Sequence, residues 1–477
     1  MIDRYRGDEM AAVWDDVSKF RAWLEVELAV LEIREKLGQI PAGTTTYCRE
    51  RTWVDAEVVA TIVRRDKAIG HDLNAFVETM RILIARGWLR DSWTNGPCLG
   101  IVARELVESS DHDEATWNLV FGRLLSEVSR PEAALFHDGM TSYDTEEGAT
   151  ALQLMVAHTI VMKRLAELGD VLLKQSERYR GAIMMGRTHG QHAQPTTFGA
   201  KLLNYLELVR RTRRRFADSR DEIRVMKLSG AVGMYGTLGP EVEVAVAERL
   251  GLVAAPVSTQ ILALDRRAQL VNGLAEIAAV VEKIARDLWI LAQTEIGEIR
   301  EPFGKRQKGS SAMPHKKNPI GLEQLFGLPR LVRGYASALL ENVATANERD
   351  ISHSSVERIA FPDAFGLVDH MLRRLVRIVR DMEVSPERML ENIGLSYGTF
   401  ASQKVEMLLK SKGMPAELAY RKVQYYSAAA VQSRESLLKV LKADVDVAAR
   451  VAPHELDDCF DLKKWVAAED VLYGRMK

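Results

Sequence analysis

Apolar side chains recur with helical spacing along most of the chain. The clearest run begins at Leu270, from which apolar residues follow one another at alternating intervals of four and three positions. Such spacing places side chains on one stripe of an α-helix. The stripe consists of Leu270, Leu274, Ile277, Val281, Ile284, Leu288 and Leu291. It predicts a single helix of roughly 30 residues.

Three long segments contain no proline, the residue that breaks helices most strongly. They cover residues 132–194, 196–239 and 257–301, and each is long enough for one or two full-length helices. Strand-like alternation bounded by turns is scarce. The pattern therefore predicts an all-α protein with a central bundle of long helices.

The helix predicted from Leu270 has little polar surface. Beside its apolar stripe it carries Ala275, Ala278, Ala279 and Ala285. A helix that is apolar over much of its surface must be buried on several sides. In a chain of this size, the pattern indicates burial against other subunits.

The composition is that of an ordinary globular protein. The chain has 477 residues, of which 47% are apolar and 27% charged, enough for roughly three domains. The net charge of −1 provides no general attraction for nucleic acid or an anionic membrane, so neither is expected as a partner. No segment approaches the roughly 18 apolar residues that a membrane span requires, and MIDRYRGDEM lacks the apolar core of a signal peptide.

Cysteine is rare. Cys48, Cys98 and Cys459 lie far apart and form no CxxC pair. This pattern argues against a disulfide framework or a zinc site and favours a reducing compartment. We therefore expect a cytoplasmic protein.

Five polar segments interrupt the helical pattern, and most of them combine His, Ser, Thr or Gly with charged residues. Each has an ordinary explanation by itself, as a helix cap, a turn or a solvated loop. His189 and His192 would share a face of a helix and could bind a metal, but no Cys or HExxH partner accompanies them. The segments are Arg4–Tyr5, GHDLNAF at Gly70–Phe76, HDGMTSYD at His137–Asp144, GRTHGQHAQPTTFG at Gly186–Gly199 and KGSSAMPHKKNPIGLEQ at Lys308–Gln324.

Taken together, these segments resemble the fumarase/aspartase superfamily and, within it, the adenylosuccinate lyase family. GSSAMPHKKNP matches the superfamily signature GSSxMPxKxNP, and ERDISHSSVER at Glu348–Arg358 narrows the match further. The resemblance runs nearly end to end, because MIDRYRGDEMAAVWDDVSKFRAWLEVELA at the start and GTFASQKVEMLLKSKGMPAELAY near the end also fit.

The resemblance implies three helical domains and a homotetramer whose core is the central bundle. Residues 1–141 would form an N-terminal domain with His71 and a probable insertion, residues 142–388 the bundle with the signature loop, and residues 389–477 a C-terminal domain. Each active site would draw loops from three subunits, so the polar segments need meet only in the assembly.

The resemblance also implies elimination of fumarate from adenylosuccinate, giving AMP, and from the succinyl-aminoimidazole-carboxamide ribotide SAICAR, giving AICAR. Ser310 would be the base, with Lys316 as a nearby positive charge that stabilises its alkoxide. His189 would be the general acid, an imidazole being suited to that role near neutral pH. Glu323 would orient His189, and His71 of another subunit would lie near the leaving group.

The remaining site residues would bind the substrate without any metal or organic cofactor. Those implied for the phosphate are Arg4, Tyr5, Arg349, Ser354 and Arg358, since guanidinium groups bind two phosphate oxygens at once. Those implied for the succinyl carboxylates, the base or the rest of the nucleotide are His71, Asp72, Thr141, Ser142, Gln260, Ser311, Lys316 and Asn318.

Several positions depart from the family pattern. Gly70 replaces a Lys or Arg, Tyr143 a small Thr, Gln194 a Glu and Gln324 an Asn, while Ala263–Leu270 differs from the usual QRDRHAEY. The stretch between His71 and His137 is longer than usual and includes the Trp-rich RGWLRDSWTNGPC, which could cover the site or extend an interface. The alternative is therefore another fumarate-releasing succinyl lyase with a different amine leaving group. A structural relative without catalysis would not need to keep Ser310 and His189.

Overall fold

The computed structural model describes residues 2–87, 114–304 and 306–476, and these residues are mainly helical. Their strands form only small two-stranded sheets, so the predicted all-α class is confirmed. The probable insertion between His71 and His137, with Cys98, lies largely outside the described residues.

Two compact units make up the described chain. Unit 1 comprises residues 1–162, 215–275 and 331–370, and unit 2 comprises residues 163–214, 276–330 and 371–477. The boundaries predicted near residues 141 and 388 stay predictions. Within the part of the chain described here, no helix is long and apolar enough to cross a membrane.

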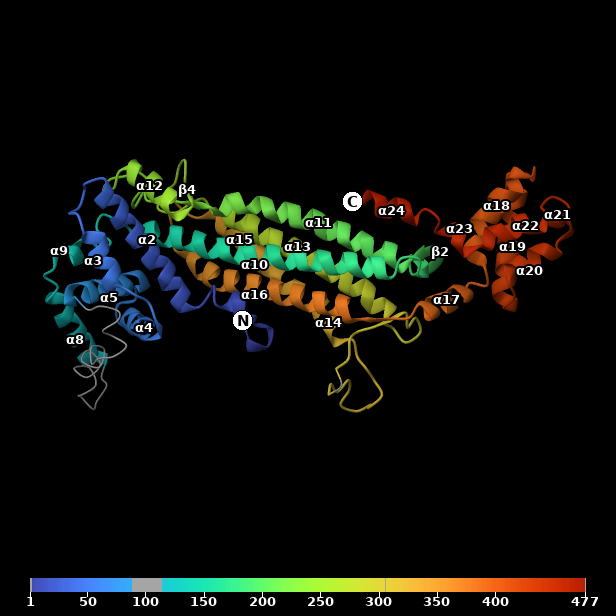
Figure 1. Ribbon diagram of the computed structural model, residues 1–477, viewed down its shortest axis with the longest axis horizontal. Coiled ribbons are helices and arrows are strands. Elements are labelled where there is room, and N and C mark those ends of the chain that lie inside the picture. The colour runs from blue at the N-terminus through green and yellow to red at the C-terminus, as the bar shows by residue number, and fades with distance from the viewer. Residues whose placement is uncertain (1, 88–113, 305, 477) are drawn as a thin grey trace. The chain divides into compact units, whose positions relative to one another are not determined.

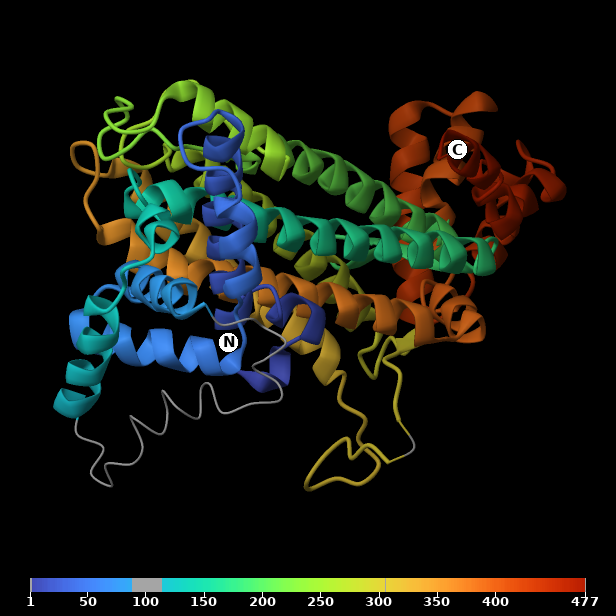
Figure 2. The same cartoon turned by 60° about the vertical axis from the view of Figure 1, so that its left-hand side comes forward.

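Four long helices contribute segments to both units, and Figures 1 and 2 show them lying side by side. In unit 1, Arg267 of one helix contacts Glu147 and Glu357 of two others. In unit 2, the Tyr205 hydroxyl donates to Asp287 at 2.8 Å. These helices are α10 (Ser142–Arg178), α11 (Phe198–Ile223), α13 (Asp265–Leu291) and α16 (Ser352–Asp381).

Helix α13 confirms the prediction made from the apolar stripe. It is one uninterrupted helix of 27 residues. Every residue of the stripe from Leu270 to Leu291 is buried, at most 3% exposed, because the 4/3 spacing keeps these side chains on one face.

Unit 1 has an aromatic core in its N-terminal part. Phe20 packs edge-on against Trp23 and stacks on Phe76. Asp15 and Asp55 begin two of the helices by accepting backbone N–H groups. The remaining elements are η1 (Asp3–Tyr5), α1 (Asp8–Ala11), α2 (Asp16–Lys36), α3 (Thr44–Arg51), α4 (Ala56–Ile69), α5 (Asp72–Arg86), α8 (Glu114–Ser126), α9 (Pro131–Leu135), β3 (Val225–Met226), α12 (Pro240–Leu250), β4 (Val253–Ala254), α15 (Pro329–Glu341, whose first two residues belong to unit 2) and η2 (Asn342–Ala344).

Unit 2 combines a β-hairpin with short C-terminal helices. These helices enclose a core of their own, centred on Val405, Leu409 and Leu441. The remaining elements are β1 (Ile183–Thr188), β2 (Gln191–Thr197), β5 (Ile299–Arg300), α14 (Ile320–Gly327), β6 (Glu383–Val384), α17 (Pro386–Gly394), η3 (Thr399–Ala401), α18 (Ser402–Ser411), α19 (Ala416–Ser433), α20 (Leu437–Ala443), α21 (Val445–Ala448), α22 (Pro453–Phe460), α23 (Leu462–Trp465) and α24 (Glu469–Arg475).

Candidate active site

A pocket of about 490 Å³ in unit 1 brings together six of the predicted site residues. It lies where the start of α5, the start of α10 and the start of α16 with its preceding loop meet. The six residues are His71, Asp72, Ser142, Arg349, Ser354 and Arg358. We call this pocket the arginine pocket.

The acidic side chain of Asp72 holds one arginine of the arginine pocket, Arg358, in place. Its carboxylate pairs with Arg358 at 2.8 Å and with Lys19 at 3.0 Å. Burial by itself would raise the pKa of Asp72, but Lys19 and Arg358 outweigh it and lower the pKa. Asp72 therefore stays ionised and orients Arg358 at the pocket wall.

The ring of Tyr143 supports the second arginine. The Arg349 guanidinium lies 3.9 Å from the ring centroid and donates to Gln260 Oε1 at 2.9 Å. Behind the ring, the Tyr143 hydroxyl and His353 Nε2 are 3.1 Å apart. Burial raises the pKa of Tyr143 to about 12, and burial with Arg267 and Arg349 lowers the pKa of His353 to about 4. Both groups are therefore neutral near pH 7.

A fully buried ion pair supports the loops that carry Thr141 and Gln260. Lys227 Nζ and Asp144 Oδ1 are 2.7 Å apart, and both side chains are 0% exposed. Asp144 also accepts the backbone N–H of Thr141, and Lys227 donates to the carbonyl of Gln260. The pair thus fixes two predicted substrate-binding residues, which are not among the residues lining the arginine pocket.

Arg4 and Tyr5 lie in η1 at the N-terminus and do not line the arginine pocket. Arg4 is exposed. The Tyr5 ring meets His370 edge-on at 5.0 Å between centroids. The structure therefore does not bring these two residues to the other predicted phosphate ligands within unit 1.

In unit 2, His189 occupies the tip of the β1–β2 hairpin. Its φ of 54° and the 76° of Gly190 are the left-handed conformations that a two-residue hairpin turn of type I′ requires. The side chain of His189 is exposed. Because His192 lies on β2, the alternative in which both histidines share a helix face is wrong.

Buried contacts anchor this hairpin. Arg187 donates to both carboxylate oxygens of Glu298, at 2.8 and 3.3 Å, and Asn392 donates to Glu298 at 2.8 Å. Gly186 allows the strands to approach, since a Cβ there would lie 2.7 Å from the Gln194 carbonyl oxygen. The strands are thus anchored close to the turn that presents His189.

The signature loop folds back on itself between β5 and α14. A Cβ on Gly309 would lie 2.0 Å from the carbonyl oxygen of Lys316, so only glycine fits there. Ser310 is half-buried, and its Oγ accepts the backbone N–H groups of Ala312 at 3.3 Å and Met313 at 3.1 Å. Ser311 and Lys316 are exposed.

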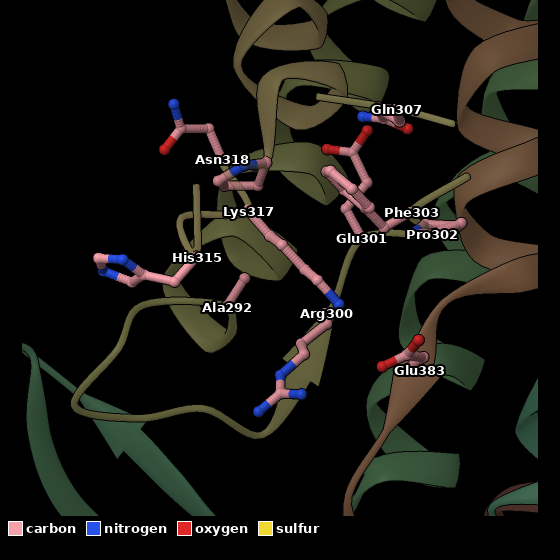
Figure 3. A pocket seen from close by; sticks show the side chains of 11 residues that line it. Ala292, Arg300, Glu301, Pro302, Phe303, Gln307, His315, Lys317, Asn318 and Glu383 are labelled. Carbon is pink, nitrogen blue, oxygen red and sulfur yellow. The ribbon is translucent and has the colours of Figure 1, made fainter. Parts of the chain in front are cut away.

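A further pocket, of about 290 Å³, lies at the base of this loop. Asn318 is the predicted site residue among those that line it. Figure 3 shows Lys317 extending toward Arg300, while the amide of Asn318 points away from them. Glu323 accepts the indole N–H of Trp289 at 3.4 Å. No hydrogen bond in the described part of unit 2 links His189 with Ser310 or Glu323, so their joint action stays a prediction.

Three residues of unit 1 were missed from the sequence. The sequence marks Tyr143 only as a departure from the family pattern, and no motif marks Glu146 or Lys227. One feature of the sequence could have indicated that Lys227 is buried. It lies among the apolar residues of VMKL, which is unusual for an exposed lysine. Among the described residues, no group of three or more His, Cys, Asp or Glu side chains is placed to hold a metal ion.

Solved structures establish the fold. The chain matches a fumarate lyase from Mesorhizobium with a TM-score of 0.82 and 22% identity, covering 100% of this chain and 99% of that one. It matches the 3-carboxy-cis,cis-muconate lactonizing enzyme of Pseudomonas putida with a TM-score of 0.81 and 25% identity, covering 99% and 96%. The family described as "Lyase" matches residues 103–334. The chain therefore has the fold of these enzymes.

Sequence relatives narrow the class. The family described as "Adenylosuccinate lyase C-terminus" matches residues 398–476. Adenylosuccinate lyases of Staphylococcus saprophyticus and Thermotoga maritima are each 38% identical to the chain, covering all of it and 99% and 100% of their own length. The chain belongs to the adenylosuccinate lyase family, and the predicted resemblance is confirmed.

Proposed function

We propose that this protein is an adenylosuccinate lyase that releases fumarate from adenylosuccinate, giving AMP, and from SAICAR, giving AICAR, in purine nucleotide biosynthesis. The family membership supports this C–N lyase activity. The observation that favours a nucleotide leaving group is the arginine pocket, where Arg349, Ser354 and Arg358 converge. Two guanidinium groups and a hydroxyl suit a phosphate, which offers several oxygens for charge-assisted hydrogen bonds.

The elimination needs a base, a site for the developing negative charge and an acid. Ser310 is the proposed base, which removes the proton from the carbon beside a succinyl carboxylate. The electron pair passes into that carboxylate, held by Lys316 and Asn318, and the carbon–nitrogen bond then breaks. His189 protonates the departing nitrogen. The N–H groups of Ala312 and Met313, which already point at Ser310 Oγ, favour its alkoxide.

The assembly that completes the site is proposed to be a homotetramer in the cytoplasm, with loops from different subunits in each active site. Apolar side chains left exposed on α15 and α16 support an oligomer. Leu331, Leu340 and Ile359 are each more than half exposed. These side chains are available to an interface with partner subunits. Partner loops would then bring Ser310 and His189 to the arginine pocket, where His71 would lie near the leaving group, and would place Glu323 beside His189.

The activity is tested by incubating the purified protein with adenylosuccinate and measuring fumarate and AMP. We expect equal amounts of fumarate and AMP from adenylosuccinate, and equal amounts of fumarate and AICAR from SAICAR. If neither substrate released fumarate but another succinyl amine did, the protein would instead be a succinyl lyase with a different amine leaving group.

Replacing Arg349 by methionine is expected to raise KM for adenylosuccinate at least about tenfold, because one charge-assisted phosphate contact is worth roughly 1.5–3 kcal/mol. The turnover number should fall much less, since the phosphate does not react. Arg421→Met is the matched control, because Arg421 is exposed on α19 and pairs with its helix neighbour Glu417. An unchanged KM in Arg349→Met would exclude Arg349 from phosphate binding.

A further inference from the structure

The arginine pocket shares part of its wall with a second cavity. This cavity of about 290 Å³ is partly walled by Trp14, Trp23 and Phe361. Tyr143, Glu146, Ser354 and Arg358 line both spaces. Glu146 therefore stands between the proposed phosphate pocket and this second cavity, and none of the roles proposed above involves it.

The carboxyl group of Glu146 lines both spaces. Within the described residues it forms no hydrogen bond or ion pair, although it is only partly exposed. The cations closest to it are already engaged, because Lys19 and Arg358 both pair with Asp72. Neither oxygen of this carboxyl is a buried atom without a partner, so both reach the space of the pocket, where a ligand can meet them.

Charged groups of both signs face Glu146 from the elements packed around it. Burial raises the pKa of Glu146 to about 7, Asp72 adds to the rise, and Lys19, Arg358 and Arg349 oppose it. A phosphate entering the pocket would add negative charge and favour the neutral carboxyl further. The other titratable or charged groups lining the two spaces are Asp16 of α2, Asp66 of α4, His71 before α5, Tyr143 of α10, Arg267 of α13 and Glu357 of α16.

We propose that Glu146 is a further substrate-binding residue, which acts as a neutral carboxylic acid and donates a hydrogen bond to the nucleotide phosphate. The inference rests on the proposed function. It adds that binding of the nucleotide is coupled to protonation of Glu146. The proton comes from solvent when the nucleotide binds to protein in which Glu146 is ionised, and no covalent bond changes. Binding should therefore weaken as the pH rises, since ionised Glu146 cannot donate and repels the phosphate.

The decisive variant is Glu146→Gln, whose amide also donates a hydrogen bond but does not titrate. The ratio of the wild-type KM for adenylosuccinate to that of E146Q should rise roughly tenfold between pH 7 and pH 8.5. Taking this ratio cancels the ionisation of the substrate phosphate and of groups common to both proteins. Glu50→Gln, at an exposed glutamate of α3, is the control and should follow the wild type at every pH.

Calorimetry of AMP binding in buffers of different ionisation enthalpy gives a second readout that needs no turnover. At pH 7.5 to 8, the wild type should take up between about half a proton and one proton more than E146Q. A KM ratio independent of pH, or equal proton uptake by the two proteins, would overturn the role of Glu146. Loss of both fumarate release and AMP binding in the wild type would instead refute the proposed function on which it rests.

Discussion

Replacing Ser310 by alanine is expected to lower kcat for adenylosuccinate at least about 100-fold, the effect of removing a general base. The variant keeps the arginine pocket, which lies in unit 1, so AMP should still bind with an affinity close to that of the wild type. Stopped-flow or steady-state measurement of fumarate release gives the rate, and calorimetry gives the affinity for AMP.

The matched control for this variant is Ser411→Ala, in which an exposed hydroxyl at the end of α18 is removed. Its rate should equal that of the wild type. If Ser310→Ala turned over at a near-normal rate, Ser310 would not be the base. If it lost AMP binding as well, the substitution would have disturbed more than the loop, and Ser310→Cys, which keeps a titratable group, would separate the two effects.

Replacing Lys227 by methionine is expected to cost about 3–5 kcal/mol of stability, because it leaves Asp144 charged and unpaired in the interior. Both side chains are fully buried, and Lys227 also donates to the carbonyls of Gly230 and Gln260. The thermal midpoint should fall by roughly 10 °C. Because the pair also fixes Thr141 and Gln260, KM for adenylosuccinate should rise in any folded fraction.

Two comparisons make this prediction specific. Lys439→Met removes an exposed lysine that pairs with Glu435 one turn away, and should cost less than about 0.5 kcal/mol. The double variant Lys227→Met/Asp144→Asn should be more stable than Lys227→Met alone, since the uncompensated charge is gone. Equal midpoints for Lys227→Met and Lys439→Met would show that the buried pair contributes nothing to stability.

The helices were predictable because their signal is local. The apolar residues from Leu270 to Leu291 show the helical spacing within one short segment. Burial of one face of α13 follows directly from that spacing. The hairpin that presents His189 was not predicted, because its strands are short and its turn depends on the left-handed backbone of His189 and Gly190. The sequence gives no strong signal for such a turn, because the same residues are also common in irregular loops.

Some residues of the candidate site could likewise be predicted from the sequence, and others could not. His71, Arg349 and Arg358 could be named from motifs, and the structure places all three in one pocket. Glu146 lies in a helix where an acidic residue is usually solvated. Its partly buried position depends on α2, α5 and α16, which are distant in sequence, so only the assembled unit reveals it.

The central claim is that a base at position 310 and an acid at position 189 act on one bond and come from different subunits. Ser310→Ala and His189→Ala should each be inactive as pure proteins. When they are mixed, dissociated and reassembled, random pairing should restore about a quarter of the wild-type activity, since one site in four then combines an intact Ser310 with an intact His189. Mixed oligomers confirmed by native mass spectrometry that remain inactive would contradict the account.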